Sequence, residues 1–337
     1  MNLLNNVNYL FKEHLHSKLI FLQKVFGRIK YYIYFCSVLQ LYNTKKITQY
    51  LKENIMRNDF LSVNSVTYGY SNKQNVFDDF SLNFDEGNII GVLGKNGTGK
   101  STLLYLLCGL LHAQKGEILF KNKNVKERNP ETLQDIFIVP EEFSMPDTTL
   151  SKYIKLLSPF YPNFSYDDMK STMDKFELDM SLNLKELSMG MKKKVFMCFA
   201  LATNTSLLLM DEPTNGLDIP SKSQFRKVIA SSMSDNRSII ISTHQVKDID
   251  ILLDKVVIIN SNEILLNQSV ADITEKLYFA ETGINDDLSD AIFTQPSLAG
   301  YSAVFRNLEN AESTMNLETL FNATLSKRDE IKKIFEK

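Results

Sequence analysis

The sequence predicts an α/β fold in which a mixed core sheet carries an antiparallel β subdomain and an inserted α-helical lobe. Over 60–84, alternating apolar positions and turn residues are typical of antiparallel strands. Beyond that region, short apolar runs alternate with helical patterns, which favours a mostly parallel sheet joined by crossover helices. A helix-rich stretch at about 143–203 separates the apolar runs at 135–139 and 206–210 and indicates the lobe.

Composition bounds the class of protein. The 337 residues are 44% hydrophobic and 23% charged, which suits two domains or one large core with additions. A formal net charge of −2 provides no general basic field, so no nucleic-acid partner is expected. No run reaches the roughly 18 uncharged apolar residues that a membrane-spanning helix needs. The three cysteines lie far apart and are predicted to be small buried hydrophobes: Cys36, Cys108 and Cys198.

Three parts are predicted along the chain. Residues 1–55 hold eight Lys or Arg, two acidic residues and an aromatic stretch at 31–35. This extension fits a membrane-surface helix, a signal sequence or a plain upstream addition, and its role stays open. The domain at 56–270 contains all the phosphate-site motifs. Residues 271–337 predict a small strand-and-helix appendage, for which packing against the core is favoured over a regulatory or dimer-contacting role.

A glycine-rich loop follows the apolar run at 89–93 and precedes a helix-forming run at 102–107. Its glycines let successive backbone N–H groups turn toward a β-phosphate. The Lys100 ammonium can reach the β- and γ-phosphates, and the Ser101 hydroxyl can complete a Mg²⁺ shell. The pattern predicts a nucleotide site made by Gly94, Lys95, Asn96, Gly97, Thr98, Gly99, Lys100, Ser101 and Thr102.

Two adjacent carboxylates follow the apolar strand predicted at 206–210. Ligands bind at the carboxyl ends of parallel strands, and Mg²⁺ prefers hard oxygen ligands. We therefore predict Asp211 beside the Mg²⁺ and Glu212 beside the γ-phosphate, where an attacking water needs a positioned base. The next core strand ends near His244, which is a candidate γ-phosphate contact.

A second anion site is predicted at a helix start 88 residues beyond the phosphate-loop lysine. Ser188 can cap this helix and Gly190 allows close approach, so free N–H groups and the positive end of the helix dipole face an anion. The lysines at 192–194 are interpreted as a solvated helix face. A turn after the paired carboxylates sets Asp218 near the same site.

Taken in this order and spacing, the motifs resemble the ATP-binding subunit of an ABC transporter over about residues 58–270. The resemblance implies a P-loop NTPase fold of the ABC ATPase type. Gly94 to Thr102 match the Walker A loop, Ser206 to Asp211 match Walker B, and Glu212 matches the catalytic glutamate, with Lys100 and His244 as the other catalytic residues.

The remaining family motifs are also matched. Ser188 and Gly190 correspond to the signature, which serves an ATP held by the opposite copy, and Asp218 corresponds to the D-loop. Met189 and Met191 replace the usual Gly and Gln of the signature. This form is similar to single-domain exporters that have Met-Lys after the signature glycine.

ATP and Mg²⁺ are the cofactors that the resemblance implies. Tyr70 falls where the family stacks an aromatic ring on adenine, although Tyr68 is close enough to compete. Glu141 occupies the position of a glutamine that touches Mg²⁺, with Glu142 as the alternative. The implied metal ligands are Ser101, Glu141 and Asp211.

The resemblance further implies that two chains assemble as a homodimer or a paired nucleotide-binding unit beside a separate transmembrane permease. The location expected is cytoplasmic, at the inner face of the cell membrane. Export is favoured because no import signature is visible. A soluble ABC-type ATPase acting on ribosomes or DNA is the alternative, and a non-hydrolysing switch is disfavoured because Glu212 and His244 are present. The transported substrate is not predicted.

Overall fold

The computed structural model describes residues 60–71 and 74–336. The predicted extension at 1–55 lies outside these residues. Asp59–Lys337 form one compact unit, to which all the described residues belong. Within this part, no helix is both long enough and apolar enough to cross a membrane.

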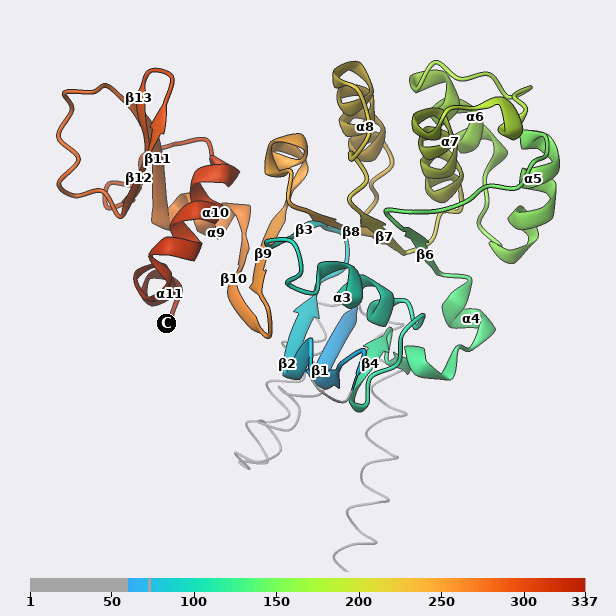
Figure 1. Cartoon of the computed structure of the whole chain (residues 1–337), viewed down its shortest axis with the longest axis horizontal. Helices are drawn as coiled ribbons and strands as arrows, with labels where there is room; N and C mark the ends of the chain where they lie inside the picture. The colour runs from blue at the N-terminus through green and yellow to red at the C-terminus, as the bar shows by residue number, and fades with distance from the viewer. Residues whose placement is uncertain (1–59, 72–73, 337) are drawn as a thin grey trace, which may run out of the picture. The chain divides into compact units, whose positions relative to one another are not determined.

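An antiparallel sheet opens the described chain, and Figure 1 shows it below the core sheet in blue and green. Its strand order is β2-β1-β4-β5, and alternating buried positions in β2 give it one apolar face. The strands are β1 (Leu61–Tyr68), β2 (Phe77–Phe84), β4 (Lys115–Phe120) and β5 (Lys123–Asn124).

The central sheet has the order β10-β9-β3-β8-β7-β6, in which β10 alone runs antiparallel to its neighbour. The near-continuous burial of its central strands is typical of a sheet covered on both faces. This arrangement confirms the predicted mixed core sheet. Its strands are β3 (Ile89–Leu93), β6 (Ile136–Val139), β7 (Leu207–Asp211), β8 (Ser238–Thr243), β9 (Lys255–Asn260) and β10 (Glu263–Ser269).

Helix α3 (Lys100–Leu107) packs between the antiparallel sheet and one face of the core sheet. Ile90 and Val92 of β3 join the cluster around α3, whereas Ile89 and Leu93 join the cluster on the opposite face. Because successive side chains of a strand point to opposite faces, β3 closes both halves of the core at once. Its carboxyl end is thereby fixed where the phosphate loop begins.

The inserted lobe consists mainly of helices between β6 and β7, as predicted, and α7 returns from it to contact β6. Ser188 caps α7 and Asp218 caps α8, which crosses between β7 and β8. The helices of the lobe are α5 (Leu150–Leu157), α6 (Tyr166–Lys175) and α7 (Met189–Ala202), with 3₁₀ turns at Ser158–Phe160 and Leu184–Glu186. A 3₁₀ turn at Val125–Glu127 and α4 (Pro130–Leu133) precede β6, and α8 (Ile219–Ser231) follows β7.

Beyond β10, the chain forms a three-stranded antiparallel sheet in the order β11-β13-β12, with helices on it (Figure 1). Helices α10 and α11 contact β10, so this appendage packs on an edge of the core sheet. Its elements are α9 (Val270–Lys276), β11 (Leu277–Thr282), β12 (Phe293–Ser297), β13 (Gly300–Arg306), α10 (Leu317–Ser326) and α11 (Arg328–Phe335).

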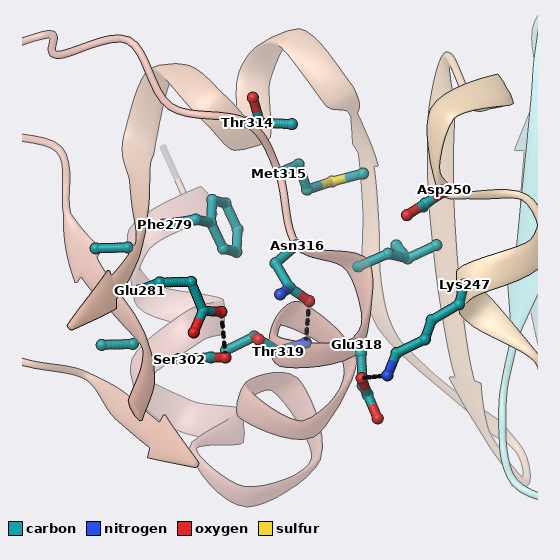
Figure 2. A pocket seen from close by; sticks show the side chains of 13 residues that line it. Lys247, Asp250, Phe279, Glu281, Ser302, Thr314, Met315, Asn316, Glu318 and Thr319 are labelled. Carbon is teal, nitrogen blue, oxygen red and sulfur yellow. Dashed lines mark hydrogen bonds and ion pairs between the residues drawn. The ribbon is translucent and has the colours of Figure 1, made fainter. Parts of the chain in front are cut away.

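A pocket of about 460 Å³ lies where the appendage meets two short 3₁₀ turns after β8, Val246–Asp248 and Asp250–Leu252. Figure 2 shows an ion pair across it, between Lys247 Nζ and Glu318 Oε2 at 2.9 Å. We refer to it as the appendage pocket. Its lining includes Lys247, Asp250, Phe279, Glu281, Ser302, Thr314, Met315, Asn316, Glu318 and Thr319.

Candidate active site

The phosphate loop lies between β3 and α3, and two of its glycines have left-handed backbone angles, with φ of +82° at Gly97 and +96° at Gly99. At Gly94, a Cβ would lie 2.5 Å from Thr98 Oγ1 and 2.7 Å from Ile259 O, so a side chain does not fit. Lys100 Nζ donates to the Gly94 carbonyl at 2.9 Å. The loop therefore folds around the lysine that its own motif supplies.

Burial lowers the pKa of Lys100, whereas three nearby carboxylates oppose that effect: Glu212, Asp211 and Glu141. The Lys100 side chain is about 6% exposed, and its Nζ lies 4.0 Å from Glu212 Oε1. An ammonium donates hydrogen bonds to an anion through the N–H directions that other acceptors have not taken. Two of those directions now go to carbonyls of the loop.

Glu212 follows β7 in the left-handed region, with a φ of +43°. Its carboxylate is buried and accepts hydrogen bonds from the Thr243 hydroxyl at 2.8 Å and the His244 backbone N–H at 3.0 Å. The His244 ring places Nδ1 2.7 Å from the same oxygen that the backbone contacts, which assigns the proton to Nδ1. The carboxylate is thus oriented by neighbouring groups of β8 and the residue after it.

Asp211 ends β7 and is nearly inaccessible to solvent. Its Oδ1 accepts from the Ser242 hydroxyl, whereas Oδ2 has no hydrogen-bond partner among the described residues. Burial raises the pKa of Asp211. A buried carboxylate oxygen without a donor is costly, and a cation is the partner that such an oxygen fits.

Glu141 lies just after β6 and accepts a 2.9 Å hydrogen bond from the Asn215 side-chain amide. It lines the same pocket as Lys100 and Glu212, whereas Glu142 is not among the lining residues. The geometry therefore favours Glu141 over the alternative at 142.

Tyr70 and Tyr68 separate clearly in the structure. The Tyr68 side chain is only 8% exposed and belongs to the core around α3. Tyr70 is 65% exposed, and its hydroxyl lies 3.0 Å from Thr102 Oγ1. The ring of Tyr70 is therefore the one available beside the phosphate loop.

A pocket of about 390 Å³, the nucleotide pocket, brings most of the predicted residues together. Its walls are formed by residues of the phosphate loop, by Glu212 and His244, and by the loop residues Tyr70 and Glu141. The lining consists of Tyr70, Val76, Asn96, Gly97, Gly99, Lys100, Ser101, Thr102, Glu141, Glu212 and His244.

Seven predicted residues are not in this lining. Gly94, Lys95 and Thr98 belong to the loop around it, and Asp211 lies buried next to Glu212. Ser188 and Gly190 at the start of α7, and Asp218 at the start of α8, do not line it. A Cβ at Gly190 would lie 3.7 Å from the Gly216 carbonyl, so the signature lies against the loop that follows β7.

The interpretation of 192–194 as a solvated face is wrong at its middle residue. Lys193 is 5% exposed and donates to the carbonyls of Glu212 and Asn215. Helical periodicity is the signal for this, because the buried Met197 and Ala200 follow it at i+4 and i+7. Sequence analysis also missed the hydroxyl groups that donate to Asp211 and Glu212, although both belong to the two residues before His244: Ser242 and Thr243.

Comparison with known proteins agrees with this geometry. A family model described as ABC transporter matches residues 77–215. The chain is 28% identical over 222 residues to the ABC transporter ATP-binding protein YtrB of Bacillus subtilis, covering 65% of this chain and 76% of that protein. It is 30% identical over 230 residues to the "Putative ABC transporter ATP-binding protein MJ1572" of Methanocaldococcus jannaschii, covering 62% of this chain and 79% of the relative.

Other matches include the lantibiotic transport ATP-binding protein SrtF of Streptococcus pyogenes, 27% identical over 58% of this chain and 85% of the relative. A solved ATP-binding subunit of an ABC transporter superposes with a TM-score of 0.56 at 24% identity, covering 64% of this chain and 91% of that one. The structural match shows the fold.

Proposed function

This chain belongs to the family of ABC transporter ATP-binding proteins and is an ATPase subunit, and we propose that two such sites close on ATP to drive export through a separate permease. The oriented Glu212 carboxylate beside Lys100 is the observation that supports hydrolysis most directly.

ATP would bind along the phosphate loop. Gly97 and Gly99 line the pocket, where backbone N–H groups of the loop would contact phosphate oxygens, and Lys100 would exchange its carbonyl partners for phosphate oxygens. Such charge-assisted bonds are stronger than the bonds to neutral carbonyls that they replace. The exposed ring of Tyr70 would cover the adenine.

The residues at the end of β7 fit Mg²⁺. The unpartnered Oδ2 of Asp211, the Ser101 hydroxyl and the Glu141 carboxylate would hold the ion, since all three offer oxygen donors. When bound, the ion would neutralise charge on the phosphate oxygens.

Glu212 would accept a proton from the attacking water. Three hydrogen bonds orient its carboxylate, which leaves lone pairs for a water donor while preventing rotation. With Nδ1 directed at Glu212, the Nε2 side of His244 would face the γ-phosphate and donate to it when the ring carries both protons.

Dimerisation is proposed because the signature residues are not among those that line the nucleotide pocket of the same chain. Ser188, Gly190 and Asp218 would complete the site of a second copy, as the helix start offers N–H groups to an anion. A permease would dock on the inserted lobe, whose exposed large apolar side chains include Leu156, Phe160 and Tyr166. That partner would place the chain at the inner face of the membrane.

The test is a comparison of wild type with Glu212→Gln. Loss of the base should reduce hydrolysis about 100- to 10,000-fold while ATP binding persists, so ATP should trap a dimer. Size-exclusion chromatography with and without MgATP measures this, with Glu117→Gln at an exposed position near the start of β4 as the control. A monomer under all conditions would contradict dimerisation, and undiminished hydrolysis would remove Glu212 from the chemistry.

The permease is tested separately by examining the genes next to that of this chain for one that encodes a membrane protein, and by co-purification of the two products. Recovery of a stable complex supports transport. A chain that instead sediments with ribosomes or DNA would support the alternative, a soluble ABC-type ATPase.

A further inference from the structure

Lys193 places a positive charge behind the active site, where no sequence motif accounts for it. Its side chain is 5% exposed, and Nζ donates to the Glu212 carbonyl at 2.8 Å and the Asn215 carbonyl at 3.0 Å. Both acceptors belong to the turn that follows β7. A surface lysine would keep its ammonium in water, so the buried position requires specific partners.

The turn that Lys193 binds contains the strained residue of the site. Glu212 has a φ of +43°, which is unfavourable for a residue with a Cβ and persists only where the surroundings hold it. Its N–H donates to Ser242 O at 2.9 Å, and its carbonyl accepts from Asn215 N at 3.1 Å. The ammonium is the only described side-chain donor to that carbonyl.

Charge also favours a cation at this place. Burial lowers the pKa of Lys193, and three carboxylates act against that effect: Glu141, Glu212 and Asp211. The same three carboxylates surround Lys100. Two buried ammonium groups therefore offset part of the negative charge of these three carboxylates.

We propose that Lys193 is a positioning residue for hydrolysis, which holds the Glu212–Asn215 turn and thereby sets the direction of the Glu212 carboxylate. This rests on the proposed role of Glu212 as base. The side chain comes from the second turn of α7, whose first residues carry the signature. A displacement of Ser188 and Gly190 along the helix axis would therefore move Glu212, because the Lys193 side chain links α7 to the turn through two hydrogen bonds.

The first test compares three single variants. Lys193→Met keeps the apolar stem and removes all donors, Lys193→Gln supplies a neutral amide with two N–H donors, and Lys192→Met is the matched control on the same helix. Lys193→Met should lower kcat about 10- to 100-fold, as expected for misplacing a catalytic group, while the dissociation constant for ATP stays near that of wild type. Lys193→Gln should recover part of kcat, and Lys192→Met should resemble wild type.

A double-mutant cycle separates positioning from general stability. In the Glu212→Gln background there is no base to direct, so Lys193→Met should leave the residual rate unchanged. The same fold-loss in both backgrounds, or a loss of ATP affinity equal to the loss of kcat, would overturn the proposal. Where Lys193→Met fails to fold, the cycle is run with Lys193→Gln. A wild-type protein without ATPase activity would instead contradict the proposed function itself.

Discussion

The two pockets of this protein differ in how their polar groups are held. In the nucleotide pocket, the Glu212 carboxylate has three donors and the Lys100 ammonium has two acceptors, and both charged groups are themselves buried. In the appendage pocket, the ion pair between Lys247 and Glu318 joins side chains that are 77% and 41% exposed. The appendage pocket is the larger, at about 460 Å³ against 390 Å³.

The volume of a pocket alone therefore does not identify an active site. Preorganised donors in a water-poor site retain their electrostatic strength, whereas exposed ion pairs are screened and contribute little. Glu281, on the wall of the appendage pocket in Figure 2, has a lowered pKa because the Ser302 hydroxyl donates to it. That bond orders one side chain without creating a catalytic arrangement.

The largest effect on the nucleotide pocket is expected from a substitution at Lys100. Lys100→Ala removes a charged donor, and hydrogen bonds to charged groups contribute about 1.5–3 kcal/mol, so ATP affinity should fall about 10- to 100-fold. Calorimetric titration with a slowly hydrolysed ATP analogue measures the change. Lys115→Ala, at the exposed start of β4, controls for net charge. Equal losses in both variants would mean that Lys100 has no specific phosphate contact.

A second change should lower activity and raise stability together. The buried Asp211 carboxylate has one unpartnered oxygen, so Asp211→Asn should increase the melting temperature of the metal-free protein by about 2–4 °C per kcal/mol recovered. Scanning fluorimetry in chelator measures this, and MgATP hydrolysis should be lost. Asp167→Asn, exposed on α6, is the control. A lower melting temperature for Asp211→Asn would contradict the argument.

The pH dependence of this stabilisation follows from the raised pKa of Asp211. A carboxyl with a raised pKa in the folded state binds its proton more tightly there than in the unfolded chain. Its contribution to stability is complete below the unfolded pKa of about 3.9 and is lost as pH rises through the folded value. The advantage of Asp211→Asn should therefore grow as pH increases above about 4.

A smaller effect is expected at Glu141, at the exposed rim of the nucleotide pocket. Glu141→Gln removes one negative charge near the triphosphate and should reduce the Mg²⁺ requirement about fivefold, equivalent to about 1 kcal/mol in a water-like medium. ATPase rates measured against free Mg²⁺ test this, with Glu142→Gln as the neighbouring control. Superimposable titrations for Glu141→Gln and wild type would remove Glu141 from the site.

Sequence analysis could predict the core of the nucleotide pocket because local pattern and strand order determine it. The phosphate loop follows a buried strand, and the carboxylates end the strand two places along the sheet, so parallel order alone brings them to one edge. The central strands β3, β7 and β8 were predicted for the same reason.

The missed residues act through tertiary contacts. Lys193 is 19 positions from the carbonyl it binds, and Asn215 is 74 positions from Glu141. Charged and amide side chains are mostly exposed in proteins, so the sequence indicates that these two face solvent. Only the three-dimensional packing shows the partners that they bind. The choice between Tyr68 and Tyr70 likewise depended on where β1 ends, because Tyr68 is its last residue and is buried, whereas Tyr70 lies beyond the strand and is exposed.

The smallest effect is expected at the ion pair of the appendage pocket. Lys247 follows His244 by three positions, so Lys247→Met tests whether the appendage controls the nucleotide pocket or only packs on the core. Because both side chains are exposed, the melting temperature should change by no more than about 2 °C, and kcat should match wild type. Glu318→Gln should be slightly more destabilising, since Glu318 also lies in the first turn of α10, where a negative charge favours the helix dipole. Raising the salt concentration should remove most of both differences. A changed kcat at an unchanged melting temperature in both variants would show instead that the appendage regulates hydrolysis through this contact.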